Sequence, residues 1–264
     1  MRVRPWSSML LIALLLALAA GCGGGPKAPS LSEERPGTLT VATIGRSVEG
    51  RPIEALSLGN GPLSVLVIGG LHTGAENPTA TVAEQLARHF GGHLNELPAA
   101  VRIIFIPLAN PDGYADETRV NANGVDLNRN WPTADWAPEA VHGEVPVSGG
   151  PAPLSEPETR ALYAFIDDIE PEVVVSFHGY GAIVEPNDSG RAKNYAAAFS
   201  KAAKYDLIDS WTYYEITGEF IEAMNDLDVA AFDVELGDGE KNRFGKQLSG
   251  LRAVLKVIAE ATDQ

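Results

Sequence analysis

Two histidines and a glutamate occupy positions from which they could bind a metal ion. His72 follows the apolar run VLVIGGL and His178 follows VVVSF, so each imidazole comes directly after a predicted strand. The carboxyl ends of strands are where open α/β sheets place their binding sites. Glu76 lies four residues after His72. Two imidazoles and one carboxylate form a typical catalytic zinc set, which leaves a fourth position for water.

A third acid is a candidate for the general base. Glu235 ends the predicted strand AAFDVEL, and a carboxylate beside a metal can take a proton from water. Asp233 shares a strand face with Glu235, so it could support a ligand or compete for the same role. Each residue alone also fits a structural role, such as a hydrogen-bond donor at a strand end or an acid near a helix N-terminus.

The elements that must position these residues follow from the hydrophobic pattern. Short β-branched runs alternate with helical patterns, which predicts a mostly parallel sheet with flanking helices. The expected strands are Thr38–Ile44, Ile53–Leu58, Val65–Ile68, Ile103–Pro107, Val173–Phe177 and Ala231–Leu236. The expected helices are Thr79–Phe90, Pro157–Ile169, Arg191–Lys204, Thr217–Asp226 and Leu248–Ala261. Asn77 before Pro78 predicts a cap, and the run Ser155-Glu156-Pro157-Glu158 predicts a capping box.

A long segment from residue 110 to residue 153 has little periodicity and is rich in Asn, Gly, Pro and Asp. A loop of this length inside a compact domain is usually functional. It contains the run NPDGYADETRVNANGVDLNRNWP. The structural roles considered for the histidines and acids leave this run unexplained.

This run resembles the zinc metallocarboxypeptidases, most nearly the murein-peptide amidases, which cut the γ-D-glutamyl–diaminopimelate bond of cell-wall peptides. The similarity lies in Asn110–Gly113, Arg119 and Gly124–Trp131. Further matches follow in the family's order: Gly45–Ile53, Gly69–His72, Leu154–Arg160, Ser176–His178 and Asp233–Leu236. The resemblance therefore extends from Thr38 to the C-terminus.

The resemblance implies one α/β catalytic domain over residues 38–264, with a mixed, mostly parallel sheet and helices on both faces. It implies that zinc is the cofactor and that His72, Glu76 and His178 bind it. The implied substrate is a peptide or a peptidoglycan peptide.

The resemblance also implies the roles of four further residues. Glu235 would act as general base and then as general acid to the leaving amine, and Arg119 would stabilise the oxyanion. Asn128 and Arg129 would bind the free terminal carboxylate of the substrate. Arginine suits that task because its planar guanidinium matches a carboxylate bidentately.

The spacing of the first two ligands departs from the family pattern, which is His-x-x-Glu. This chain has His72-Thr-Gly-Ala-Glu76, one residue longer. Gly74 can absorb the extra residue in a local turn, because glycine adopts backbone conformations that other residues avoid. We therefore still expect Glu76 to be a ligand.

The N-terminus carries the pattern of an exported lipoprotein. Two arginines precede the apolar run Met9–Ala20, which is too short to span a bilayer and is typical of a secretory signal. The run ends before Cys22, the only cysteine, in a context that resembles the bacterial lipobox. We expect a signal peptide at 1–21, a flexible tether at 22–37, and anchoring to the cell envelope through lipid on Cys22. The alternative is an ordinary signal peptide.

Two other functions fit part of the sequence. An N-acyl amino acid deacylase of the succinylglutamate desuccinylase type shares the segment Asp-Leu-Asn-Arg, but the flanking motifs argue against it. A non-catalytic peptide-binding lipoprotein would have lost the metal or the base, whereas Glu235 and Arg119 are both present. The net charge of −15 argues against nucleic-acid binding, which requires a basic surface.

Overall fold

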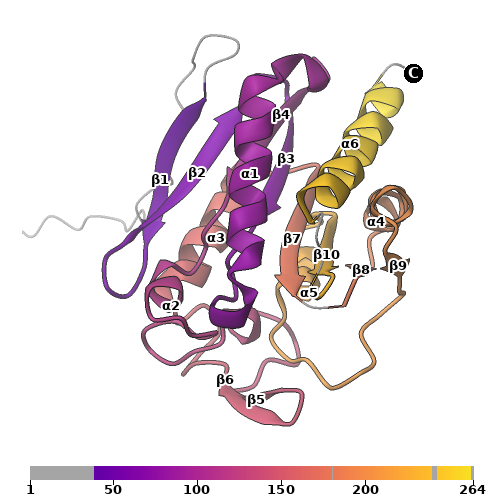
Figure 1. The fold of residues 1–264 in the computed structure, drawn as a ribbon. Helices are drawn as coiled ribbons and strands as arrows, with labels where there is room; N and C mark the ends of the chain where they lie inside the picture. The colour runs from indigo at the N-terminus through magenta and orange to yellow at the C-terminus, as the bar shows by residue number, and fades with distance from the viewer. Residues whose placement is uncertain (1–38, 180, 240–242, 263–264) are drawn as a thin grey trace, which may run out of the picture.

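The computed structural model describes residues 39–179, 181–239 and 243–262. In these residues one eight-stranded mixed sheet carries helices on both faces (Figure 1). The strand order is β1-β2-β4-β3-β7-β10-β8-β9. The strands are β1 (Thr40–Arg46), β2 (Pro52–Leu58), β3 (Leu63–Ile68), β4 (Val101–Ile106), β7 (Val173–Gly179), β8 (Ile183–Pro186), β9 (Asp206–Leu207) and β10 (Ala231–Leu236).

The centre of the sheet is parallel, and its edges contain antiparallel pairs. Strands β4, β3, β7 and β10 are joined by parallel ladders. At one edge β1 and β2 run antiparallel to their neighbours, and at the other β10 pairs antiparallel with β8. The central strands are almost continuously apolar because helices cover both of their faces. The mixed, mostly parallel sheet predicted from the sequence is confirmed.

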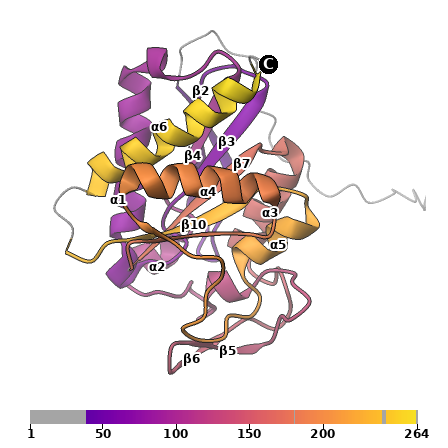
Figure 2. The same cartoon turned by 90° about the vertical axis from the view of Figure 1, so that its right-hand side faces the viewer.

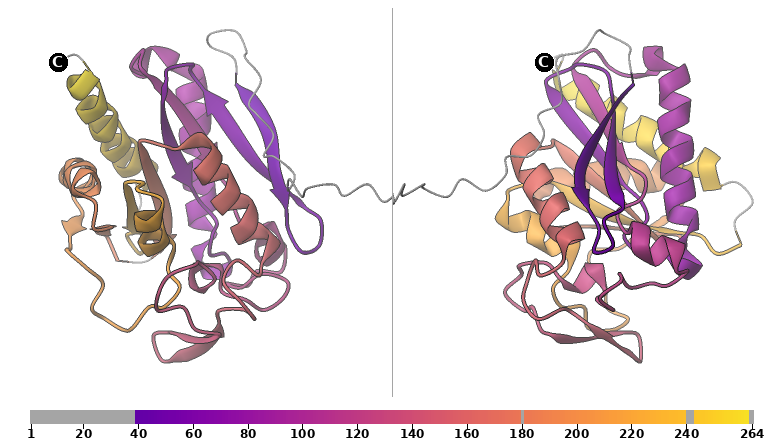
Figure 3. Two further views of the ribbon diagram at one scale, coloured as in Figure 1. Left: turned by 180° about the vertical axis from the view of Figure 1, so that it is seen from behind. Right: turned by 90° about the vertical axis from the view of Figure 1, so that its left-hand side faces the viewer.

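Two apolar cores lie on opposite sides of the sheet. On one side α1 (Pro78–Gly92), α4 (Gly190–Ala203) and α6 (Arg243–Thr262) bury their apolar faces in a single cluster. Figure 2 shows α4 and α6 side by side over this face. On the other side α3 (Pro157–Ile169) and α5 (Phe220–Asp226) pack in a second cluster, and Figure 3 shows α3 on this opposite face.

The six predicted strands and five predicted helices are all present, with shifted ends. Asn77 is the N-cap of α1 and Pro78 is its first residue, as predicted, but the predicted capping box at residues 155–158 is wrong. Asn77 precedes α1 with helical backbone angles, and its side chain makes no capping hydrogen bond, because it continues from the short helix η1 (Gly74–Glu76). The N-cap of α3 is Glu156, whose N–H donates to Oδ1 of Asn130 at 3.2 Å. Ser155 donates its hydroxyl to the Glu156 carboxylate instead of capping the helix.

The long polar segment predicted to be functional is an ordered layer at the carboxyl ends of the central strands. It contains the short helices α2 (Pro111–Ala115) and η3 (Leu127–Arg129) and the hairpin of β5 (Glu139–His142) and β6 (Val145–Ser148). Figure 1 shows this hairpin beyond the carboxyl end of β7. A further short helix, η2 (Leu94–Glu96), follows α1. The layer therefore lies where His72 and His178 leave their strands.

The predicted signal peptide (1–21), Cys22 and the tether (22–37) lie outside the described residues. Within the residues that are described, none of the helices is both long and apolar enough to cross a membrane.

Candidate metal centre and substrate pocket

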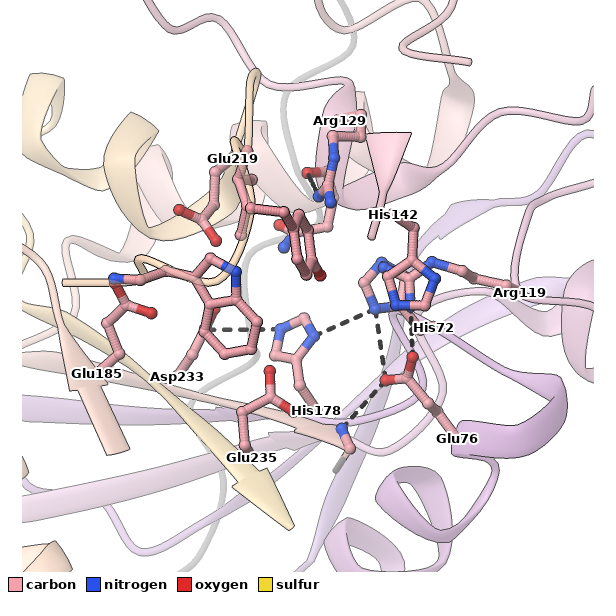
Figure 4. Close-up of a pocket in the computed structure, with 15 residues that line it drawn as sticks. His72, Glu76, Arg119, Arg129, His142, His178, Glu185, Glu219, Asp233 and Glu235 are labelled. Carbon is pink, nitrogen blue, oxygen red and sulfur yellow. Dashed lines mark hydrogen bonds and ion pairs between the residues drawn. The ribbon is translucent and has the colours of Figure 1, made fainter. Parts of the chain in front are cut away.

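The structure brings together the three predicted metal ligands. His72 follows β3, Glu76 ends η1 and His178 lies in β7, the strand that pairs with β3. Nδ1 of His72 is 3.2 Å from Nδ1 of His178 and 3.4 Å from Oε2 of Glu76 (Figure 4). The candidate ligand atoms all lie within 4.8 Å of one another, and all three residues are buried.

Gly74 accommodates the unusual spacing of His72 and Glu76. Its φ of +67° is a left-handed conformation that glycine adopts without a steric penalty. A Cβ at this position would lie 2.8 Å from the carbonyl oxygen of Glu117, so a larger residue would also clash. The turn leads directly into η1 and carries Glu76 to the histidines, as the sequence predicted.

Both imidazoles are oriented by partners on the side away from the centre. Nε2 of His72 is 2.8 Å from Oδ1 of Asp126. Nε2 of His178 is 2.9 Å from Oγ of Ser176 and 3.5 Å from Oδ1 of Asp233. A carboxylate or hydroxyl at the outer nitrogen fixes the ring and makes the inner nitrogen a better ligand. Two imidazoles held in this way and one carboxylate fit a zinc ion.

The charges around the centre favour a cation. Burial by itself would raise the pKa of Glu76, but His72, Arg119 and His178 lower it to about 2, so this side chain is a carboxylate. Burial would likewise lower the pKa of His178, but Asp233, Glu235 and Glu76 raise it to about 10. The same acids that favour a proton here would favour a metal ion in its place.

Arg119 lies beside the ligands and is fixed by two acids. Its Nη1 donates to Oε1 of Glu76 and its Nε donates to Oδ2 of Asp126 at 2.9 Å. The side chain is 19% exposed and lines the same cavity as the ligands. Asp126 therefore holds both His72 and Arg119. Asp126 lies inside the Gly124–Trp131 motif, but its residue type and spacing alone did not mark it as a site residue.

Asn128 and Arg129 line this cavity too. The Asn128 carboxamide oxygen accepts the N–H of Phe220 at 2.9 Å, which leaves its N–H groups as donors. The buried Arg129 donates to the carbonyl oxygens of Asn128 at 2.8 Å and of Val141 at 3.0 Å. Within the described chain no acid forms an ion pair with Arg129, so its charge is available to a carboxylate ligand.

The two acids of β10 have different surroundings. Glu235 lies in register with His178 on the neighbouring strand, and its carboxyl lines the cavity. Burial, with a further contribution from Glu76 and Asp233, raises the pKa of Glu235 to about 7. A carboxyl that titrates near neutrality can both take and return a proton. Asp233 instead forms an ion pair with His178.

Several residues of the cavity wall were not predicted. Glu185 lies in β8, Glu219 precedes α5, and His142 comes from the β5–β6 hairpin. Of two adjacent tyrosines, Tyr214 lines the cavity, whereas Tyr213 is 67% exposed. The elements that carry these residues are short and irregular, so they give no periodic signal.

Comparison with known proteins identifies the family. The chain matches the family described as "Zinc carboxypeptidase" over residues 28–254. The chain belongs to the zinc carboxypeptidase family. Murein peptide amidase A of Escherichia coli K12 is 34% identical over 206 residues, which are 72% of this chain and 78% of that relative. The family assignment makes the protein a metallo-hydrolase of peptide bonds with zinc as its cofactor, in agreement with the His-Glu-His cluster.

Solved structures of the family share the fold. The crystal structure of murein-tripeptide amidase MpaA from Escherichia coli O157 has a TM-score of 0.64 and 27% identity, and the match covers 83% of this chain and 91% of that chain. Carboxypeptidase A from Helicoverpa armigera has a TM-score of 0.70 at 19% identity, with 86% of this chain and 70% of that chain covered. The second likeness concerns the fold alone.

Proposed function

We propose that the protein releases the C-terminal residue of a peptide by hydrolysis and that its physiological substrate is a peptidoglycan stem peptide. The observation that carries the first part is that one cavity contains both a catalytic and a recognition group. The His-Glu-His cluster and Glu235 lie in the same cavity as Arg129, a buried cation without an ion-pair partner in the described chain. A free α-carboxylate is the group that such a guanidinium binds.

In this proposal His72, Glu76 and His178 hold the zinc ion. A zinc ion there supplies Lewis acidity, which polarises a carbonyl group and eases the deprotonation of water. Arg129 and the Asn128 carboxamide bind the terminal carboxylate and so place the last amide bond of the substrate beside Glu235.

The proton transfers belong to Glu235. Its carboxylate takes a proton from water as the water oxygen attacks the scissile carbonyl carbon, and the carbonyl oxygen becomes an oxyanion. The guanidinium of Arg119, 19% exposed at the edge of the cavity, stabilises that negative charge. Glu235 then returns the proton to the amide nitrogen as the carbon–nitrogen bond breaks, which yields a free amino acid and a shortened peptide.

The stem-peptide part of the proposal rests on the relatives and on the N-terminal sequence. The curated relative with 34% identity is a murein peptide amidase. The apolar run before Cys22 is the pattern of an exported lipoprotein. We propose that the protein is exported and held at the envelope by lipid on Cys22, where it would meet wall peptides.

A substrate panel tests the proposal. The zinc-loaded protein would be incubated with L-Ala-γ-D-Glu-diaminopimelate, with peptides of ordinary α-linkage and with N-acyl amino acids, and Glu235→Gln would serve as the control. Release of diaminopimelate that the control lacks is the expected result. Cleavage of α-linked peptides alone would overturn the stem-peptide assignment, and cleavage of acyl amino acids alone would indicate a deacylase. A protein that binds zinc and cleaves none of them would be a binding protein.

Lipidation is tested separately. Metabolic labelling with a fatty-acid analogue should label the native chain and fail to label Cys22→Ser. Equal labelling of both forms, or labelling of neither, would contradict the anchor.

A further inference from the structure

His142 lies in the cavity wall and has no role in the reaction described above. It is the last residue of β5, and its side chain is partly buried and lines the cavity. Within the described chain its imidazole makes no hydrogen bond, and its ring contact is with Tyr214, with the ring centroids 5.9 Å apart. A histidine ring has an N–H donor in either protonation state. His142 therefore offers the cavity a donor that the described protein groups leave unused.

The hairpin that carries His142 is fixed to the site by its main chain. Arg129 donates from Nη2 to the carbonyl oxygen of Val141 at 3.0 Å, one residue before His142. On the second strand of the hairpin, the carbonyl oxygen of Ser148 accepts the N–H of Asp126 at 2.9 Å. The backbone position of His142 is thus set by the same two residues that shape the proposed carboxylate site and hold the first metal ligand. A side chain on such a backbone is well placed to recognise a ligand.

His142 lies on the side of the cavity where Arg119 is found. Burial and the positive charges of Arg119 and His72 lower the pKa of His142, so both positive groups lie near the ring. Figure 4 shows His142 and Arg119 at one side of the cavity and Glu185 at the other. A ligand group that reaches the imidazole therefore also reaches the surroundings of Arg119.

The proposed binding mode brings one particular residue of the substrate to this side. Arg129 and Asn128 hold the terminal carboxylate, and Arg119 stabilises the oxyanion that forms at the scissile carbonyl. The chain on the N-terminal side of that carbonyl must then leave the centre past Arg119, towards His142. In L-Ala-γ-D-Glu-diaminopimelate the residue at this position is the γ-linked D-Glu, whose α-carboxylate is free.

We propose that His142 is a specificity-determining residue that donates a hydrogen bond to a carboxylate on the substrate residue before the scissile bond. The inference rests on the proposed function, because the terminal carboxylate must occupy Arg129 for the preceding residue to reach His142. A hydrogen bond to an ionised acceptor is about twice as strong as one to a neutral acceptor. Arg119 and a bound zinc ion add positive charge on this side, which favours a carboxylate over an uncharged group.

Two simpler roles do not account for a histidine at this position. In the part of the chain that the structure describes, the side chains whose ligand atoms converge on one point are His72, Glu76 and His178, so His142 is not a fourth metal ligand. The contact with Tyr214 requires only an aromatic ring, which phenylalanine would supply as well.

Two tripeptides test the role of His142 because they differ only at the group in question. One is L-Ala-γ-D-Glu-diaminopimelate, and the other has D-isoglutamine in place of D-Glu, so that its α-carboxylate is a carboxamide. We expect the zinc-loaded native chain to cleave the carboxylate form with a kcat/KM at least about tenfold higher, since hydrogen bonds to charged groups are among the stronger ones.

Three variants separate a binding role from a structural one. His142→Phe keeps an aromatic ring against Tyr214 but has no donor, so the ratio should fall to about one, mainly through a higher KM for the carboxylate form. His142→Gln retains an N–H donor and should keep most of the preference. The matched control is His93→Phe, which makes the same change at an exposed histidine outside the cavity and should alter neither value.

The outcomes distinguish the role of His142 from the function itself. Equal cleavage of the two tripeptides by the native chain would refute this role while the amidase activity stands. A preference that survives in His142→Phe would assign the carboxylate to another donor and would also refute it. If neither tripeptide is cleaved, the proposed stem-peptide function fails, and calorimetry with zinc-loaded Glu235→Gln decides the role of His142 alone. The carboxylate form should then bind at least about tenfold more tightly than the carboxamide, and His142→Phe in the same background should abolish the difference. Equal binding of the two tripeptides, or binding of neither, would overturn the inference.

Discussion

Replacing Asp126 by asparagine should weaken zinc binding although Asp126 is not itself a ligand. The Asp126 carboxylate is fully buried, 2.8 Å from Nε2 of His72 and 2.9 Å from Nε of Arg119. Its Oδ1 also accepts the N–H of Asn128 at 2.9 Å. Asparagine keeps the shape and one acceptor oxygen, but it loses the negative charge that these three groups share.

The expected size of the effect follows from these contacts. Loss of a carboxylate behind a ligating imidazole typically costs about 10-fold to 100-fold in metal affinity. The native residue is firmly ionised: burial would raise the pKa of Asp126, but His72 and Arg119 hold it well below its usual range. Arg119 keeps its ion pair with Glu76 in this variant. The variant should therefore still fold, and the expected loss is in zinc affinity.

Competition with a zinc chelator of known affinity measures the change, and Asp112→Asn is the matched control. Asp112 is another fully buried acid of the same polar segment, but it binds Ser47, Arg51 and the N–H of Glu49 and does not line the cavity. Both variants should be less stable to heat in the metal-free form, and only Asp126→Asn should lose zinc affinity. Unchanged affinity in Asp126→Asn, or an equal loss in Asp112→Asn, would refute the reasoning.

Three further predictions concern single positions. Glu235→Gln should lower kcat by about 100-fold or more because it removes the general base, while zinc content by metal analysis stays at one ion per chain; substantial residual activity would exclude Glu235 as the base. Gly74→Ala should destabilise the fold by about 1–2 kcal/mol and weaken zinc binding, because it adds a steric clash to a left-handed backbone conformation. The control is Gly124→Ala, where φ is +75° and the surrounding space is open, and it should lower stability without changing zinc affinity. Burial alone would raise the pKa of the Asp112 carboxyl, but hydrogen bonds from Ser47, the N–H of Glu49 and Arg51 lower it. The stabilisation by this carboxylate is therefore present above the unfolded pKa of about 3.9 and is lost as pH falls. Unfolding free energies measured from about pH 6 to about pH 3 should depend on pH more steeply in the native chain than in Asp112→Asn.

The sequence allowed prediction of those parts of the fold whose burial leaves a pattern. The central strands are recognisable because both faces are covered, so runs such as Val65–Ile68 are apolar throughout. Strand β8 is four residues long, contains Glu185 and Pro186, and lies next to the two-residue edge strand β9, so it lacks the long apolar run of the central strands. The hairpin of β5 and β6 lies inside a polar segment and contains Pro146, so it too lacks a sequence pattern typical of strands.

The residues of the candidate site likewise fall into those that a sequence pattern reveals and those that it does not. The two histidines of the predicted metal site and Glu235 lie at or soon after the ends of predictable strands, and Glu76 follows His72 by four residues, so these residues could be found from the sequence. Glu185 and Glu219 are 34 positions apart and line the same cavity because β8 pairs with β10 and α5 packs against β10. A main-chain hydrogen bond, or an acid that reaches the site from a distant loop, produces no local sequence pattern from which its role could be predicted.

The positions of the metal ligands along the chain have a consequence for stability. Nδ1 atoms of His72 and His178 meet across 106 positions of sequence, so a bound ion ties together two distant stretches of one polypeptide. In many exported proteins a disulfide joins distant segments of the chain, but a chain with one cysteine cannot form an internal disulfide. Bound zinc would link the two segments of this domain, and it would stabilise the native state by mass action because it binds that state alone. Depriving a cell of zinc would therefore remove the protein as well as its activity, because the metal-free chain would spend more time unfolded and open to proteases.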